Sequence, residues 1–500
     1  MTLATNNAAG RKAYAPVVAI VILSSALAVA MLTHDHDWGD DFAAYIMQAA
    51  SIVHGTERQE VARAAFSIQQ SSRYFGPVAT PWGFPALLAP AYAACGLNIW
   101  CLKLVNVPLF AAFVAAFWVF AASRLPPADA LLLTSVLAFN PVLLAFENFV
   151  LSDLAFLFLS TVCIVLIDVF VVQPARPEGS QRGNVAIGAA AFLAFFARAN
   201  GALLLPTLFV TQLAVYGRRR RSDIQTRPPT AALVPYAVFM ALAAVAAIVF
   251  PGGGLSDVQH YRTLTVGRLL ENVSAYLVVP SIFFWPIPFY ELFYGALFPF
   301  LICGLAWYSR EELPAVVYSG LTVLLFVFWP EQQGLRYIFP VLPFFVYFCY
   351  RGMKANAFAL TDRYRTAGNG LTRAVWIAVV VIFVLASIRI ARQRSSPAGG
   401  AFQPTSVQMF DAIKARTAPG DVVIFDKPRL MRLMTDRDAI LVDRCDQLAK
   451  GRYVVVRKHG GATNQIAPEE IGTCDPSLQL APVFDNPQFV VYRIVPKRTS

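Results

Sequence analysis

The chain has 500 residues, of which 57% are hydrophobic and only 14% are charged. This composition is too apolar for a soluble protein of ordinary surface-to-core ratio, so we expect a polytopic membrane protein. The formal net charge of +11 is spread over short loops between apolar runs, so the sequence predicts no basic patch and no nucleic-acid partner.

The first apolar run covers residues 14–32 and follows Arg11 and Lys12, an order that is also typical of a signal peptide. The run is long enough to span a bilayer, and no small-residue cleavage motif follows it in the sequence. We therefore expect this segment to remain in the protein as a membrane anchor.

Apolar runs of spanning or near-spanning length recur along most of the chain. They cover residues 14–32, 103–122, 128–146, 151–172, 185–197, 201–216, 231–250, 290–308, 314–330, 337–350 and 373–390. About 11 transmembrane helices are therefore expected. With a cytoplasmic N-terminus, the basic residues of the short loops from Arg124 to Arg373 all lie on the inner side of the membrane, as the positive-inside rule requires. This pattern predicts an integral protein of a bacterial inner membrane.

Two further apolar stretches, residues 83–97 and 276–289, are rich in proline and aromatic residues. We interpret both as interfacial or re-entrant segments at the outer leaflet, because counting one of them as a span would invert every later loop. The odd number of spans then places the chain after about residue 395 on the periplasmic side. A transmembrane domain is thus predicted for residues 1–395, including an acidic outer loop at 33–82.

Residues 396–500 differ in character, because short β-branched runs alternate there with helical and loop sequence. They predict a small soluble α/β domain on the periplasmic side. Cys445 and Cys474 both fall in it and can pair in an oxidising compartment, although the sequence leaves this pairing open. The other cysteines lie in or beside apolar segments, where a thiol is usually a small buried hydrophobe: Cys95, Cys101, Cys163, Cys303 and Cys349.

The outer loop begins with the acidic stretch "HDHDWGDDFAAYIMQAASIVHG". Apolar residues at helical spacing follow Asp40, and Gly55 ends the run as a C-terminal cap would, so an amphipathic helix on the membrane surface is expected. Capping of this helix explains one aspartate, Asp40, but not the neighbouring Asp41.

The four residues from His34 to Asp37 have side chains that are good ligands for several divalent ions. On an extended segment, however, successive side chains point to opposite sides, so a shared ion is not expected. The sequence therefore predicts no metal site and no cofactor.

Other polar residues fall at the same outer level of the predicted bundle. They are His54, Glu147, Asp153, Arg198, Glu331, Arg336 and Tyr337. Ionisable residues at membrane depth are costly and usually functional, although Arg198 and Arg336 could also snorkel or pair with a nearby carboxylate. A site for a lipid-linked phosphate needs such a set: an anion clamp at headgroup depth, and a carboxylate that takes a proton from an acceptor hydroxyl.

At these residues the chain resembles the polytopic glycosyltransferases of the C superfamily, in particular the protein O-mannosyltransferase and lipid A aminoarabinose transferase branch. The similar segments are "GDDFAAYIMQAASIVHG", "TPWGFPALLAP", "NFVLSDLAFLFLS", "ARANGALLLPTLFV" and "RYIFPVLPFF", and the tail segment "KPRLMRLMTDR" is similar to the family's outer-face domain. Their order and spacing carry the resemblance, since each motif is short.

The resemblance implies inverting transfer of a sugar from a polyprenyl-phosphate donor to a lipid, polysaccharide or protein hydroxyl on the outer face, without a metal. It implies that Asp40 is the general base, with Asp41 beside it and Asp153 as a second acidic position. Arg336, Tyr337 and Arg198 would bind the donor phosphate, and His54, Glu147 and Glu331 are possible substrate-binding residues. Asn200 stands where many relatives have an acidic residue, and no lysine precedes Pro81, so the donor sugar is undetermined.

Two other classes compete with this interpretation. A transporter or flippase of a lipid-linked saccharide would pair its buried charges near mid-membrane across two related halves, and no such repeat is evident. A membrane-anchored binding or assembly protein would act through its α/β tail, and the charges of the other outer loops would then have no reason to match the acidic first loop.

Overall fold

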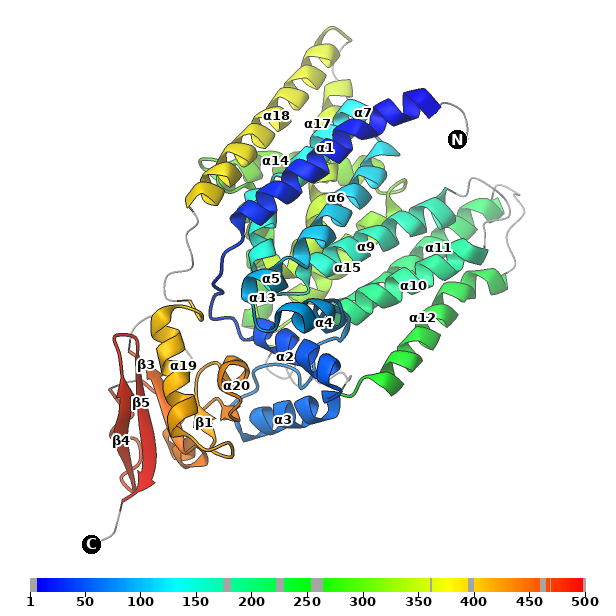
Figure 1. Cartoon of the computed structure of the whole chain (residues 1–500). Helices are drawn as coiled ribbons and strands as arrows, with labels where there is room; N and C mark the ends of the chain where they lie inside the picture. The colour runs from blue at the N-terminus through cyan, green and yellow to red at the C-terminus, as the bar shows by residue number, and fades with distance from the viewer. Residues whose placement is uncertain are drawn as a thin grey trace.

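The computed structural model describes residues 7–173, 181–221, 229–252, 264–359, 362–393, 400–458, 465–467 and 469–497. Helices fill the chain up to Gln393, and a five-stranded sheet lies near its end. The helices form a bundle, and the sheet lies beyond the end of the bundle opposite the one where α1 begins (Figure 1).

Every apolar run predicted to span is helical. The helices are α1 (Asn7–Met31), α6 (Asn106–Ala122), α7 (Pro127–Ala138) followed by α8 (Pro141–Ala145), α9 (Asp153–Ile167), α10 (Gln181–Ala197), α11 (Leu204–Arg221), α12 (Pro229–Val249), α14 (Tyr290–Tyr308), α15 (Leu313–Val327), α17 (Leu342–Ala359) and α18 (Asp362–Gln393). In the described part of the chain, seven spans are long and apolar enough to cross a membrane, or eight if the bent pair 127–138 and 141–148 is one span.

The protein is therefore an integral membrane protein, with fewer full-length spans than the predicted 11. Three predicted runs give no full-length span: α10 has 17 residues, α15 has 15, and the run 337–350 is divided between short helical turns and the start of α17. The end of α15 has a local cause, because Pro330 follows closely and the residue before a proline is disfavoured in helical conformation.

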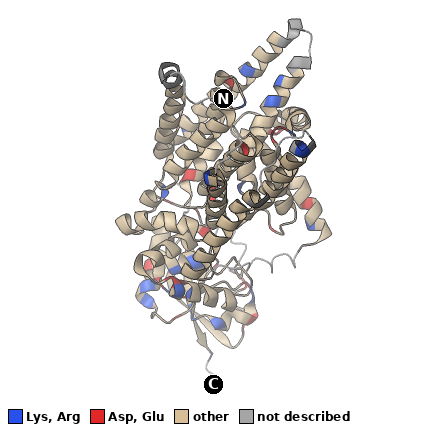
Figure 2. Ribbon diagram, turned by 90° about the vertical axis from the view of Figure 1, so that its right-hand side faces the viewer, with Lys and Arg blue, Asp and Glu red and all other residues tan. Residues whose placement is uncertain are grey.

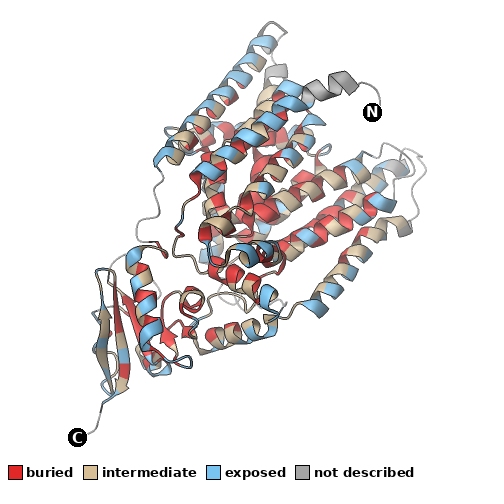
Figure 3. Ribbon diagram, viewed as in Figure 1, coloured by how far each residue is buried: buried red, intermediate tan, exposed pale blue. Residues whose placement is uncertain are grey.

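Large aromatic side chains fill the centre of the bundle, including Phe113, Phe117 and Tyr347, which are fully buried. Buried residues line the inward faces of the helices, and exposed ones lie on the outward faces (Figure 3). The helices α14 and α17 cross closely through two glycines, since a Cβ atom at Gly304 would lie 2.1 Å from the carbonyl oxygen of Phe348. Small residues allow such close approach of helices in membranes.

Basic residues near the end of the bundle where α1 begins are neutralised by buried acids. Arg124 contacts Asp168 at 2.7 Å and Glu312 at 2.6 Å. Lys354 of α17 contacts Asp129 at 2.6 Å. Charged residues are otherwise sparse along the helices and gather where the bundle meets the C-terminal sheet (Figure 2).

The two proline-rich stretches form short helices. Residues 83–97 contain α4 (Gly83–Cys95), an apolar helix shorter than a span, and α5 (Ile99–Lys103) follows it. Residues 276–289 contain the end of α13 (Val266–Val278) and η5 (Val279–Phe284). Cys95 and Cys101 form a disulfide between α4 and α5, so the interpretation of these two cysteines as buried thiols was wrong.

The C-terminal residues form a mixed sheet with the strand order β2-β1-β3-β5-β4. The strands are β1 (Val423–Ile424), β2 (Ala439–Ile440), β3 (Tyr453–Arg457), β4 (Leu478–Asp485) and β5 (Phe489–Pro496), and α19 (Pro404–Arg416) and α20 (Pro428–Thr435) accompany them. Strand β1 pairs in parallel with β2 and β3, whereas β5 is antiparallel to β3 and β4. Cys445 and Cys474 form a disulfide here.

The outer loop packs against this sheet. It contains α2 (Asp41–His54) and α3 (Glu57–Gln70), and the backbone N–H of Ser72 donates to the carbonyl of Leu441 at 2.9 Å. Helix α2 contacts both α4 and α20, so protein packs against it on more than one side. Its position on the membrane surface stays a prediction. The predicted domain boundary at residues 395/396 falls outside the described residues, and the division into two domains stays a prediction.

The close crossing of α14 and α17 can be tested with Gly352→Ala. A Cβ atom at position 352 would lie 1.8 Å from the carbonyl oxygen of Phe300, so the helices must move apart. We expect the free energy of unfolding in detergent to fall by about 1–3 kcal/mol or more, the usual cost of overpacking.

The matched control is Gly295→Ala in α14, because outside its own helix no described atom lies within 4 Å of a Cβ placed there. This control should leave the free energy of unfolding unchanged, or raise it by up to about 1 kcal/mol through helix propensity. Equal effects of the two substitutions on unfolding would contradict the close crossing.

Candidate active site

A cavity of about 310 Å³, open to solvent, lies where the outer loop meets the helical bundle. Its walls are His36, Asp37, Gly39, Asp40, Asp41, Phe42, Phe146, Phe149, Leu151 and Arg336. Carboxylates and one guanidinium thus face a partly aromatic wall. Such a mixture of apolar surface and a few convergent polar groups is typical of a ligand site.

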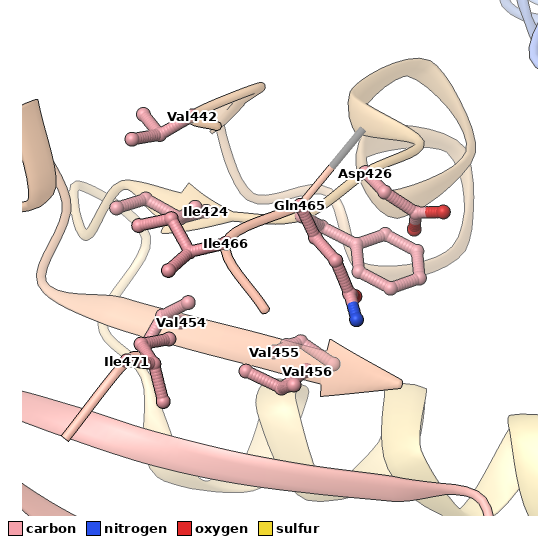
Figure 4. A pocket seen from close by; sticks show the side chains of 10 residues that line it. Ile424, Asp426, Val442, Val454, Val455, Val456, Gln465, Ile466 and Ile471 are labelled. Atoms are coloured by element: carbon pink, nitrogen blue, oxygen red, sulfur yellow. The ribbon is translucent and has the colours of Figure 1, made fainter. Parts of the chain in front are cut away.

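A second hollow, of only about 10 Å³, lies beside the strands of the C-terminal sheet and differs in chemistry. Its side chains are mostly aliphatic, such as Ile424, Val454 and Ile471 (Figure 4). The carboxylate of Asp426 on its wall is 3.3 Å from the guanidinium of Arg457, so that charge is already paired. We therefore take the first cavity as the candidate site.

Asp40 precedes α2, but its carboxylate does not cap that helix in the described structure. Its Oδ1 atom instead accepts a hydrogen bond from the backbone N–H of Leu430 at 3.1 Å, in the first turn of α20. The first N–H groups of a helix have no partner within the helix, so Asp40 supplies an acceptor from a distant part of the chain. The simple capping interpretation of Asp40 is therefore wrong.

The two neighbouring aspartates differ strongly in acidity. Burial raises the pKa of Asp40 to about 6, against the opposing charges of Arg429 and Lys427. Burial also acts on Asp41, but the charges of Arg336 and Arg429 outweigh it and lower the pKa of Asp41 to about 2. Asp40 can thus exchange a proton near neutral pH, whereas Asp41 stays ionised.

Arg336 joins two carboxylates from distant segments. Its Nη1 donates to Asp41 at 2.8 Å, and its Nε donates to Asp153 at 3.0 Å. Arg198, extended between α10 and η3 (Ala199–Leu203), donates to the same Asp153, whose side chain is 1% exposed. The predicted residues Asp41, Asp153, Arg198 and Arg336 are therefore in direct contact, with charges that alternate.

Arg429, which sequence reasoning did not identify, extends this set. It lies in α20, its side chain is 4% exposed, and its Nη1 is 3.5 Å from Asp41. The sequence signal was the basic segment "KPRLMRLMTDR". Nothing in that segment indicates that one of its arginines contacts Asp41, which is far away in the sequence.

Asp153 and Arg198 join the site through Arg336 without lining the cavity, and four other predicted residues lie away from both the cavity walls and these ion pairs. Tyr337 stacks on Phe326, with 4.2 Å between ring centroids. His54 is exposed at the opposite end of α2 from Asp41, and Glu331 is exposed before α16 (Leu335–Ile338). Glu147 is fully buried in η1 (Phe146–Asn148), where its carboxylate accepts no hydrogen bond from the described residues. Their roles stay predictions.

The side chains of the stretch from His34 to Asp37 include groups that hold the start of the outer loop in place through hydrogen bonds. Nε2 of His36 accepts from the backbone N–H of Val150 at 3.2 Å, so Nδ1 carries the proton and faces Asp37 at 2.8 Å. Asp35 is buried and accepts from the backbone N–H of Phe402 at 2.9 Å. In the described part of the chain, no group of three or more His, Cys, Asp and Glu residues is arranged to hold a metal ion.

Comparison by sequence gives no match, either to a known family model or to a curated protein. Comparison by structure does give matches. ArnT from Cupriavidus metallidurans, bound to undecaprenyl phosphate, has 16% identity and a TM-score of 0.58, over 95% of this chain and 97% of that chain. An oligosaccharyltransferase from Archaeoglobus fulgidus in the apo form has 12% identity and a TM-score of 0.53, over 89% of this chain and 70% of that chain.

The oligosaccharyltransferase AglB from Archaeoglobus fulgidus, in complex with an inhibitory peptide and a dolichol-phosphate, has 12% identity and a TM-score of 0.51, over 88% of this chain and 69% of that chain. Each match extends over the helical bundle and reaches well beyond any single motif. The resemblance predicted from the sequence is confirmed for the fold, which this chain shares with ArnT over 95% of its length.

Proposed function

We propose that this protein transfers a sugar from a polyprenyl-phosphate donor to a hydroxyl acceptor, with inversion at the anomeric carbon. The observation that carries the proposal is a carboxylate with a pKa of about 6, Asp40, in a cavity that it shares with Arg336. A base near neutral pH beside an arginine suits a reaction in which a hydroxyl loses its proton while a phosphate leaves.

In the proposed reaction Asp40 accepts the proton of the acceptor hydroxyl. The oxygen attacks the anomeric carbon as the bond between that carbon and the phosphate oxygen breaks, and the lipid phosphate departs with the electron pair. Arg336, which reaches the cavity, stabilises the charge that develops on the phosphate. Asp41 and Asp153 hold Arg336 in place, and Arg198 reinforces Asp153.

The solved structures support the class of donor. ArnT was solved with undecaprenyl phosphate, and AglB with a dolichol-phosphate, so both of these neighbours in fold bind polyprenyl phosphates. By analogy the cavity faces the periplasm, with the N-terminus in the cytoplasm of a bacterial inner membrane. The acceptor class, whether lipid, polysaccharide or protein, is not assigned.

The position of the ionisable residues favours an enzyme over a transporter. Asp40 and Asp41 lie in the outer loop and Arg336 in the short helix α16, outside the candidate spans, whereas a transporter of the inverted-repeat type places its site near the membrane midplane. The alternative in which the tail alone does the work is disfavoured as well, because α20 bonds directly to Asp40.

Asp40→Asn tests the base. The amide has nearly the same shape but cannot take up the proton, so sugar transfer from purified polyprenyl-phosphate donors should fall by about 10²–10⁴-fold. Transfer of radiolabelled sugar to membrane acceptors measures this. Asp446→Asn is the control, because Asp446 is exposed and pairs only with the exposed Arg444 among the described residues. Activity retained by Asp40→Asn would reject Asp40 as the base.

The pH dependence gives a second test. If Asp40 must be ionised to act, kcat/KM should fall about tenfold per pH unit below about 6 and level off above it. The fall begins near pH 6 because the pKa of Asp40 is raised, whereas an ordinary aspartate would remain ionised down to about pH 4. A profile that stays flat between pH 5 and pH 8 would contradict the role given to Asp40.

A further inference from the structure

We infer that the C-terminal region completes the active site through α20, with Arg429 as the positioning residue that holds the Asp40–Asp41 pair. The role of Arg429 in catalysis rests on the proposed function, whereas the contacts of α20 with the Asp40–Asp41 pair do not depend on it. In this arrangement Arg429 touches neither donor nor acceptor, and acts by fixing the place and the charge of the two carboxylates.

The position of the Arg429 side chain is fixed from the outer loop. Its Nη2 donates to the carbonyl of Pro77 at 2.7 Å, and its guanidinium lies 5.3 Å from the centre of the Phe75 ring. With Nη2 held in this way, Nη1 faces Asp41 at 3.5 Å. A buried guanidinium that is held by a neutral carbonyl keeps its charge available for the nearby carboxylates.

The loop has a glycine where the guanidinium lies. Gly76 has a φ angle of +137°, and a Cβ atom there would lie 2.7 Å from Nη2 of Arg429. A larger residue would thus meet both backbone strain and a clash with the guanidinium. Loop and arginine therefore fit each other at this point, although they are far apart in the sequence.

Helix α20 is held on the outer loop at further points. Arg432 contacts Glu60 of α3 at 2.8 Å, with both side chains largely buried. Arg63 of α3 contacts Asp436 at 2.6 Å and Asp438 at 2.9 Å, just beyond the end of α20. These ion pairs fix α20 relative to the loop, so the Leu430 N–H reaches Asp40 in a set geometry.

Asp40 shares its cavity with His36, Asp37 and Arg336, but the groups with the largest effect on its pKa come from two elements. From α20 and the residue before it come Arg429, Lys427 and the N–H of Leu430, all of which lower the pKa of Asp40 against the effect of burial. From α2 comes Asp41, which raises that pKa. Loss of Arg429 therefore shifts the balance toward protonated Asp40 and deprives Asp41 of one of its two arginines.

Arg429→Ala tests the inference through the pH profile of transfer. We expect the acidic limb of kcat/KM to move to higher pH by about 1 unit, since a nearby opposite charge typically lowers a carboxyl pKa by 1–3 units. The loss of kcat/KM should be about fivefold at pH 6, approach about tenfold at lower pH, and be negligible at pH 9. Arg429→Lys, which keeps the charge, should restore most of the native profile.

The control for the pH profile is Arg444→Ala, an exposed arginine of the same region, which should not shift the limb. An equal loss at every pH for Arg429→Ala would show a merely structural role, and an unchanged profile would show no role. Either result overturns the inference.

A second measurement does not depend on transfer. Asp40 has a raised pKa, so its ionisation lowers stability as pH rises, and without Arg429 this decline continues to higher pH. Arg429→Ala should therefore lower the melting temperature in detergent more at pH 8 than at pH 5. Asp41, with a pKa of about 2, is ionised at both pH values and adds no difference.

When Arg429→Ala is combined with Asp40→Asn, the extra fall in melting temperature at pH 8 should disappear, because the carboxylate that titrates is no longer present. If it persists in that background, Arg429 does not act on Asp40. If the native protein transfers no sugar but the melting temperatures behave as expected, the proposed function fails while the contact between α20 and Asp40 stands. If the native protein transfers sugar but Arg429→Ala melts like the native protein at both pH values, the inference about Arg429 fails while the proposed function stands.

Discussion

The guanidinium of Arg336 is the interaction on which the geometry of this site depends. It contacts Asp41 at 2.8 Å and Asp153 at 3.0 Å, and so connects the start of α2 to the start of α9. Arg198 and Arg429 extend the chain of charges at either end. Charges that are shielded from water must be paired to be tolerated, and here each carboxylate has an arginine on both sides. Segments that are far apart in the sequence are thereby held around one cavity.

Within this set the neighbouring residues Asp40 and Asp41 take different roles because their surroundings differ. Asp41 faces two arginines and has a pKa of about 2, so it serves as a fixed negative charge. Asp40 is partly buried, accepts a backbone N–H and has a pKa of about 6, so it can take up a proton. Pairs of carboxylates whose environments separate their pKa values are a recurrent means of dividing acid–base work from electrostatic support.

Much of this could be predicted from the sequence. The apolar runs gave the helices, and the acidic residues after the first run, together with Asp153, Arg198 and Arg336 at the ends of later runs, were expected to converge because short loops return to the same membrane face. Fewer runs form full-length spans than predicted, because an apolar run does not reveal that α10 and α15 are short or that the run 337–350 is divided among several helical segments.

The contribution of α20 could not be predicted. The bond from Leu430 to Asp40 joins residues 390 positions apart, and a backbone N–H leaves no sign in the sequence. The disulfide between Cys95 and Cys101 was missed for a related reason, since both lie in apolar surroundings where buried thiols are common. Tyr337 follows Arg336 directly but packs on Phe326, because successive residues of the short helix α16 point in different directions.

In the proposed reaction, the balance of charge explains how Asp40 could act as a base beside a phosphate. Asp40, Asp41 and Asp153 bring three negative charges when all are ionised, and Arg198, Arg336 and Arg429 bring three positive ones, with Lys427 acting on Asp40 in addition. An arriving phosphate adds negative charge, which makes Asp40 more ready to accept a proton. As the acceptor proton reaches Asp40, one negative charge is removed there while the phosphate leaves with its own, and the arginines need not move. Covering Asp40 with α20 keeps this exchange near neutral pH, because burial places its pKa where the proton can both arrive and depart.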